Sequence, residues 1–174
     1  MIELVAVGAG VGPDRLEALS RELARVFRTS CRVRNEVVDG KFAHHAARAQ
    51  YHSTAILERL QSISPNGNSN LLGVTAVDLF VPIFTFVFGE AQLAGNCALA
   101  SLYRLSEEHY GLPADEAKLR ERLTKEAVHE LGHTFGLRHC EDWQCVMASS
   151  HSVELVDVKS VEFCGDCARL VRGA

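Results

Sequence analysis

The order of apolar segments predicts a mixed α/β fold, in which helices pack on a twisted sheet. Short runs rich in Val and Leu alternate with longer segments in which apolar residues recur at helical spacing. Clusters of glycine, proline and asparagine separate these segments, as expected of turns. The 174 residues suffice for a single domain over 1–174 with its own core.

The first half of the chain is expected to run β-α-β-α-β. An apolar run that ends at a glycine indicates a buried strand, and leucines three and four residues apart indicate the helix after it. The second helix is expected to end at the turn cluster Ser64-Pro65-Asn66-Gly67-Asn68. The segments are, in order, a strand from Ile2 to Gly8, a helix from Asp14 to Phe27, a strand from Cys31 to Val38, a helix from Ala43 to Ile63 and a strand from Leu71 to Phe80.

The second half is expected to add two β segments and one long helix. Alternating phenylalanines over 84–88 indicate a short strand or an extended loop. A further strand is predicted over Cys97–Arg104, and a long helix over Asp115–Leu137 stops at Gly136. After that helix no strong period holds, and cysteines and turn residues dominate the sequence.

Composition and charge exclude several classes of protein. The net charge of −4 and the isoelectric point near 6.1 give no broad basic surface, so nucleic acid is not expected as a partner. No uncharged apolar run reaches the length of a membrane span, so no membrane partner is expected either. No Lys or Arg precedes Arg15, which argues against a secretory signal and for a soluble, cytoplasmic protein. The oligomeric state is left open, although a monomer is compatible with these features.

A glycine-rich turn after the first strand is similar to a dinucleotide-binding fingerprint. Gly8, Gly10 and Gly12 stand between the strand and a helix, but Pro13 occupies the place of the third glycine of G-x-G-x-x-G. Asp39 is a loose fit to the acidic residue that such a unit needs about 20 residues later. A flexible strand-to-helix turn is therefore the favoured interpretation over nucleotide binding.

The strongest signal is the run from His129 to His139, which has the form H-E-x-x-H-x-x-G-x-x-H. Two histidines four residues apart lie on one face of a helix, where both imidazoles can bind one Zn²⁺. Gly136 allows a left-handed turn, after which the third histidine can reach the metal. Three protein ligands leave one position for water, which is typical of a catalytic zinc. The predicted ligands are His129, His133 and His139.

Glu130 follows the first of these histidines and is the candidate general base. It stands beside the metal rather than on it, where it can take a proton from the metal-bound water. A carboxylate in this place would have no purpose in a purely structural site. The alternatives are a polar helix face without metal, or a metal site without catalysis, which a fourth protein ligand would close. His44, His45, His109 and His151 are conceivable extra ligands, although solvent exposure is their default interpretation.

Four of the six cysteines form a second cluster near the end of the chain. Two pairs at metal-binding spacing favour a closed tetrahedral zinc site, which would be the second zinc of the chain. A redox pair or disulfide at Cys164-Gly165-Asp166-Cys167 and an iron–sulfur site are the alternatives. The isolated Cys31 and Cys97 are expected to be free and buried. The predicted ligands are Cys140, Cys145, Cys164 and Cys167.

Met147 follows the third histidine by eight residues. Ordinary packing would explain a lone methionine, but next to this motif a methionine turn beneath the metal is favoured. The extended histidine motif with this methionine resembles the metzincin metalloproteases. The additional cysteines, in the order His-Cys, four residues, Cys-x-Met and then C-x-x-C, resemble the archaemetzincin family within that clan.

The resemblance implies a zinc metallopeptidase that acts on peptides or proteins. It implies an antiparallel edge strand above the cleft, which we place at Cys97–Arg104. It also implies that the domain has an upper part at about 1–137 and a lower part at about 138–174. It also implies that Glu130 is the general base and Met147 the residue of the Met-turn. Some metzincins have a tyrosine just after this methionine that assists the reaction, but Ala148, Ser149 and Ser150 stand there in this chain. The alternative function is a non-catalytic zinc protein whose cleft binds peptides.

The adjacency of His139 and Cys140 suggests that the two metal sites are coupled. One peptide link would join a catalytic ligand to a structural one. We therefore expect the cysteine site to hold His139 and Met147 in place, in a segment with no strong period of its own. Such outer support commonly changes metal affinity by about 10–100-fold.

Overall fold

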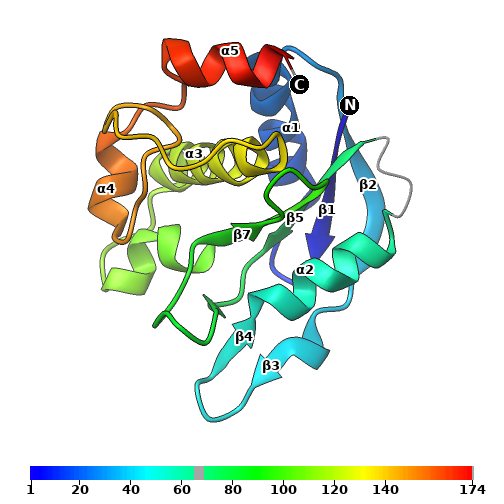
Figure 1. Cartoon of the computed structure of the whole chain (residues 1–174). Coiled ribbons are helices and arrows are strands. Elements are labelled where there is room, and N and C mark those ends of the chain that lie inside the picture. Colours follow the sequence, from blue (N-terminus) through cyan, green and yellow to red (C-terminus); the bar gives the residue numbers. More distant parts are fainter. Residues whose placement is uncertain (65–68, 174) are drawn as a thin grey trace.

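The computed structural model describes residues 1–64 and 69–173 and confirms the mixed α/β architecture. Its main sheet has five strands in the order β2-β1-β5-β8-β7. Four of them are parallel, and β7 joins the edge antiparallel to β8 (Figure 1). The strands are β1 (Ile2–Val7), β2 (Cys31–Val38), β5 (Asn70–Thr75), β7 (Gly89–Ala91) and β8 (Cys97–Ser101).

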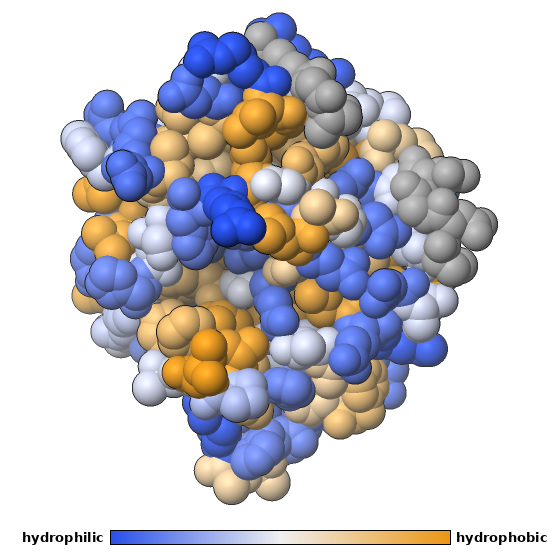
Figure 2. All heavy atoms as spheres, in the orientation of Figure 1, coloured by the Kyte–Doolittle hydropathy of each residue, from blue (hydrophilic) through white to orange (hydrophobic). Residues whose placement is uncertain are grey.

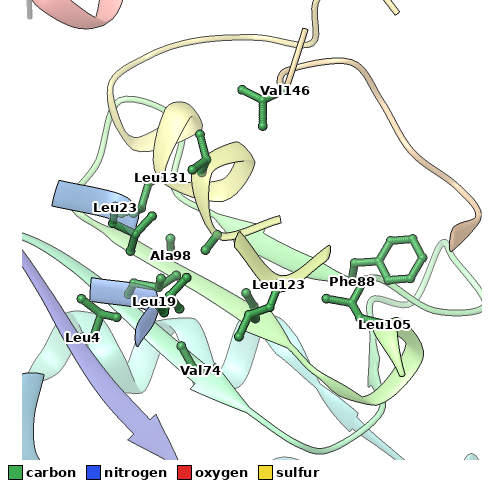
Figure 3. Close-up of a cluster of buried hydrophobic side chains, with 14 of the residues drawn as sticks. Leu4, Leu19, Leu23, Val74, Phe88, Ala98, Leu105, Leu123, Leu131 and Val146 are labelled. Carbon is green, nitrogen blue, oxygen red and sulfur yellow. The ribbon is translucent and has the colours of Figure 1, made fainter. Parts of the chain in front are cut away.

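Helices cover both faces of this sheet, and alternation along the strands supplies each face with its own core. Even-numbered residues of β1 such as Leu4 pack with α1 (Pro13–Phe27) and α3 (Glu116–Thr134). Val5 and Val7 pack on the opposite face with α2 (Ser53–Ser62). Figure 3 shows the first of these clusters, in which Leu19 and Leu23 of α1 meet Leu123 and Leu131 of α3 over the sheet.

The second predicted helix is wrong in its first ten residues. Instead of starting at Ala43, the chain makes a 3₁₀ turn, η1 (Lys41–Ala43), and a small hairpin of β3 (His44–His45) and β4 (Gln50–His52) before α2. β4 then pairs in parallel with β6 (Leu79–Phe80) to form a separate three-stranded sheet. Long-range pairing thus overrides the local helical preference of an Ala-rich segment. Residues 65–68 of the predicted turn cluster lie outside the described residues.

The predicted strand from Leu71 to Phe80 is interrupted over residues 76–78. β5 ends at Thr75, and the chain bends before β6 enters the second sheet. The Asp78 carboxylate accepts hydrogen bonds from Arg104 at 2.6 and 2.7 Å and from Gln50 at 3.0 Å. Because these partners come from distant parts of the chain, the bend has no local sequence signal. The phenylalanines of 84–88 lie in the extended loop between β6 and β7.

The antiparallel edge strand is not the segment that we assigned to it. The strand predicted at Cys97–Arg104 is β8, which ends at Ser101 and lies inside the sheet, parallel to β5. The edge strand is β7, three residues at Gly89–Ala91. β7 is too short to show a period of its own, whereas β8 is fully buried and strongly apolar, as interior strands are.

The chain after α3 is more regular than its sequence suggests. It contains α4 (Val153–Val158), which packs against the long helix, and α5 (Gly165–Gly173). These short helices have too few turns for a helical period to stand out in the sequence. The 3₁₀ turns η2 (Tyr103–Leu105) and η3 (Glu107–Tyr110) lead from β8 into α3. Both isolated cysteines are free, with Cys97 buried as predicted and Cys31 only half-buried.

Candidate metal centre and active site

The helix α3 carries the first two histidines of the motif through the centre of the molecule. Its N-terminus is capped by the Asp115 carboxylate, which accepts from the backbone N–H of Lys118 at 2.9 Å. Nearly every side chain of its second half is buried. The helix ends at Thr134, and Gly136 takes the left-handed conformation, with φ of 86°, that the sequence predicted for the turn.

The three histidines of the motif converge at this turn. The Nε2 atoms of His129 and His133 are 3.1 Å apart, and one ring nitrogen of each of the three residues lies within 4.8 Å of the others. His139 comes from outside the helix, as the glycine turn implies. Two nitrogens about 2.05 Å from a tetrahedral zinc would lie roughly 3.3 Å apart, so the arrangement fits that ion.

Backbone carbonyls orient the two helical imidazoles. The Nδ1 atom of His129 lies 2.9 Å from the carbonyl oxygen of Val146, and that of His133 lies 2.7 Å from the carbonyl oxygen of Leu137. A proton on Nδ1 leaves Nε2 with its lone pair free to bind a metal. Burial lowers the pKa of both imidazoles, that of His129 well below its ordinary value, so the neutral form that binds metal is favoured.

Glu130 lies beside this group without belonging to it. Its side chain is buried under the edge strand: a Cβ on Gly89 would come within 2.7 Å of Glu130 Oε1. Burial raises the pKa of Glu130 well above its ordinary value, and the neighbouring Glu126 raises it further. The carboxylate is therefore screened from bulk water.

The edge strand β7 is fixed over the site from both ends. Val87 donates to the carbonyl of Leu79 before it, and Ala94 donates to the carbonyl of His133 at 2.9 Å after it. Glu90 points to the other face, where it accepts from the hydroxyls of Ser53 and Thr54 in α2. Among the described strands none pairs with the outer edge of β7, so its backbone is open to an added strand.

The four predicted cysteines also converge. Their sulfur atoms lie within 4.8 Å of one another, and those of Cys140 and Cys164 are 3.8 Å apart. Two thiolates about 2.3 Å from a tetrahedral zinc would lie roughly 3.8 Å apart, so this cluster fits a closed Cys₄ site. Cys145 Sγ accepts from the backbone N–H groups of Met147 and Cys164, an arrangement that suits a thiolate. None of the four forms a disulfide.

Two backbone connections link the cysteine cluster to the histidines. His139 precedes Cys140, and Cys145 precedes Val146, whose carbonyl oxygen faces His129. Cys140 also donates its backbone N–H to the carbonyl of Met147 at 2.9 Å. The Met147 side chain is buried against Gly132 in α3.

Some predicted possibilities find no place in the described part of the chain. His44, His45, His109 and His151 do not join the three clustered histidines, so no fourth imidazole closes the site there. Gly8 and Gly10 adopt positive φ in a turn before α1, as expected of the favoured interpretation. The sequence did not reveal the close approach of Gly89 to Glu130, nor the carbonyls of Val146 and Leu137 that orient the imidazoles, because no local pattern marks these residues.

No described helix has the length and apolar character to cross a bilayer. On the face drawn in Figure 2, hydrophobic side chains form separate patches between hydrophilic ones. This distribution agrees with the modest mean hydropathy of +0.02.

A mixed sheet with one antiparallel edge strand, above a helix with this histidine motif, defines the metzincin class of zinc metallopeptidases. A model of peptidase family M54 matches residues 25–173. The archaemetzincin of Methanocaldococcus jannaschii is 40% identical to the chain, and the match covers 91% of this chain and 86% of that protein. The archaemetzincin of Archaeoglobus fulgidus is also 40% identical, and the match covers 93% of this chain and 94% of that protein. The chain belongs to this family, the archaemetzincins, and is a zinc metallopeptidase.

Solved structures agree with this assignment. The crystal structure of the A. fulgidus archaemetzincin, complexed with malonate, has a TM-score of 0.83 and 38% identity, and covers 98% of this chain and 99% of its own. A zinc-dependent peptidase from Methanocorpusculum labreanum has a TM-score of 0.88 at 27% identity, with 98% and 100% of the two chains covered. Peptides or proteins are therefore the substrates.

Proposed function

We propose that this peptidase binds two zinc ions per chain, one catalytic and one structural, and hydrolyses peptide bonds with Glu130 as general base. The observation that carries the proposal is the convergence of three imidazole nitrogens within 4.8 Å beside a buried carboxylate. The proposed ligands are His129, His133 and His139 for the catalytic zinc, and Cys140, Cys145, Cys164 and Cys167 for the structural zinc.

The protein's own groups would perform the proton transfers. Zinc bound at the histidines would supply Lewis acidity, which acidifies water and polarises the scissile carbonyl. Glu130 would accept a proton from the attacking water on its carboxylate and deliver it to the amine nitrogen that leaves. Gly89 and β7 would keep that carboxylate buried and close to the histidines.

The open edge of β7 is the proposed binding site for the substrate backbone. An extended peptide would lie along Gly89–Ala91 and exchange main-chain hydrogen bonds with it. This placement would bring a scissile bond between the edge strand and the histidines. Side-chain preferences would then depend on the loops on either side of β7.

We also propose that the chain divides, within one domain, into an upper part at about 1–137 and a lower part at about 138–174. The sheet, α1, α2 and α3 make up the upper part. The lower part would be held together by the Cys₄ zinc, with Met147 as the Met-turn beneath the catalytic ion. Its two short helices and few strand contacts support this need for a metal.

Zinc content tests the two-site proposal directly. Elemental mass spectrometry would count zinc per chain in the wild-type protein and in His129→Ala, both purified without chelator. We expect two zinc ions in the first protein and one in the second. A matched variant of an unclustered histidine, His151→Ala, should keep both ions. Equal zinc in all three proteins, after incubation with added zinc, would contradict a histidine metal site.

A further inference from the structure

One buried ion pair near the proposed active site takes part neither in the proposed metal coordination nor in the proposed proton transfers. Glu126 and Lys159 face each other at 2.8 Å, and their side chains are 5% and 0% exposed. Neither Lys159 Nζ nor Glu126 Oε1 gains a well-aligned hydrogen bond within the described part of the chain. Burying two charges with so few partners costs folding free energy, and an apolar pair is often as stable. Stability therefore does not explain the pair.

The other buried charges of α3 are satisfied in a different way. Arg122 forms two hydrogen bonds with the Asp157 carboxylate and one with the carbonyl of Leu105. Lys125 donates to the carbonyl of Asp157 at 3.0 Å and pairs with the exposed Glu121. These contacts fasten the helix to α4 and to η2. The Glu126–Lys159 pair differs from these contacts because neither Lys159 Nζ nor Glu126 Oε1 has a further hydrogen-bond partner among the described residues.

Its position places it behind the proposed catalytic groups. Glu126 precedes Glu130 by four residues, so the two carboxylates lie on one face of α3, one turn apart. Lys159 follows α4, in the segment after Met147. Glu126 also precedes His129 by three residues, so the Lys159 ammonium held against it lies about one helical turn from a proposed metal ligand.

We propose that Lys159 is a positioning residue of the active site. Held against Glu126, its ammonium makes the buried face behind the histidines neutral, which sets the affinity of those histidines for zinc. The pair also fixes the segment after Met147 to α3. This inference rests on the proposed histidine zinc site. Removing either charge alone would leave the other uncompensated beside a dication, whereas removing both would restore neutrality.

Opposite changes in metal affinity distinguish this role from a structural one. Cobalt(II) is the probe, because its thiolate complexes absorb differently from its imidazole complexes and the two sites can be followed separately. In competition with a chelator, Glu126→Gln should weaken binding at the histidine site by about tenfold, since a lone ammonium repels the ion. Lys159→Met should strengthen binding by a similar factor. The double variant should return to within about threefold of wild type.

A merely structural pair would weaken binding in both single variants, and that outcome, or no change in either, would overturn the proposal. Lys125→Met is the matched control, because it removes another buried lysine of the region and should leave cobalt affinity unchanged. If the single variants do not fold, the charge-balanced double variant decides: wild-type affinity supports the proposal and a large loss refutes it. Loss of one cobalt ion in His129→Ala would show which cobalt signal belongs to the histidine site. If His129→Ala binds as much cobalt as wild type, the proposed histidine metal site is wrong, and this inference fails with it.

Discussion

Gly132 and Met147 are packed so closely that only a glycine fits on the helix: a Cβ at residue 132 would lie 2.4 Å from the methionine sulfur. Gly132 lies between the two helical histidines in the sequence, directly before His133. The Met147 side chain can take this position only because residue 132 has no β-carbon. This contact also gives Gly132, the second residue after Glu130, a physical role.

We expect Gly132→Ala to displace Met147 and to destabilise the protein by about 1–3 kcal/mol, because overpacking a buried contact forces the backbone or side chain to move. Chemical denaturation would measure the change. Gly165→Ala is the control, since its Cβ would meet nothing closer than Arg169 at 3.8 Å. Equal stability of Gly132→Ala and wild type would show that Met147 can move away without cost.

Gly89→Ala should impair catalysis more than metal binding. The new Cβ would meet the carbonyl of Leu99 at 2.4 Å and Glu130 Oε1 at 2.7 Å, so both the edge strand and the carboxylate must shift. A displacement of this kind can cost about 10²-fold in rate. Steady-state assay on a cleaved peptide, with zinc content measured in parallel, checks the prediction. Loss of the histidine-site zinc would point instead to a collapsed site.

Glu130→Gln should retain both zinc ions and lose hydrolysis. The amide has the size of the carboxyl group but cannot take a proton from water, and general-base assistance is commonly worth 10²–10⁴-fold. The assay compares kcat with wild type at equal zinc content. Unchanged turnover would remove Glu130 from the mechanism.

Replacing Cys164 and Cys167 with serine should weaken zinc at the histidines as well as at the cysteines. Cys140 and Cys145 adjoin His139 and Val146, so a loosened cluster would release a ligand and the carbonyl that orients another. We expect about 10–100-fold lower affinity at the histidine site. Cys31→Ser, outside the cluster, serves as control. A fully retained catalytic metal in the double variant would show that the sites are independent.

Asp157→Asn should reduce stability near neutral pH but not in acid. Its hydrogen bonds to Arg122 hold the pKa of Asp157 below its ordinary value. The pKa of Asp157 is lower in the folded protein than in the unfolded chain. The ion pair with Arg122 therefore stabilises the fold fully at pH values above the ordinary aspartate pKa, and this stabilisation is lost as the pH falls through the pKa of the folded state. We expect a loss of about 1–2 kcal/mol at pH 7 that disappears in acid. Glu22→Gln, which breaks an exposed pair with Arg25, should change little at either pH.

The parts of the site that the sequence reveals are those encoded locally. The spacing of His129 and His133 and the left-handed Gly136 follow from helix geometry, so they were predicted from the motif alone. The identity of the edge strand was not, because β7 is three residues long and its role depends on pairing with β8. The contact of Gly89 with Glu130 joins residues 41 positions apart, which no periodicity can indicate.

The same limit applies to the first ten residues assigned to the second helix. Over His44–His52 the local composition favours a helix, yet Tyr51 donates to the carbonyl of Asp78 and the segment becomes a hairpin. Lys159 is a comparable case, since a lone lysine after a short helix gives no sign that it will be wholly buried. Fold class and local motifs were thus accessible, whereas contacts between distant segments were not.

The brevity of β7 has a consequence for how the protein behaves at high concentration. A strand edge that can receive a peptide can equally receive the matching edge of a second molecule, and exposed edges are common starting points for aggregation. Three residues offer too few main-chain bonds for two such edges to hold each other without further contacts. A peptide that also bound a metal ion would be held by more than these few main-chain hydrogen bonds. The length of the strand therefore lets the enzyme discriminate between its substrate and itself.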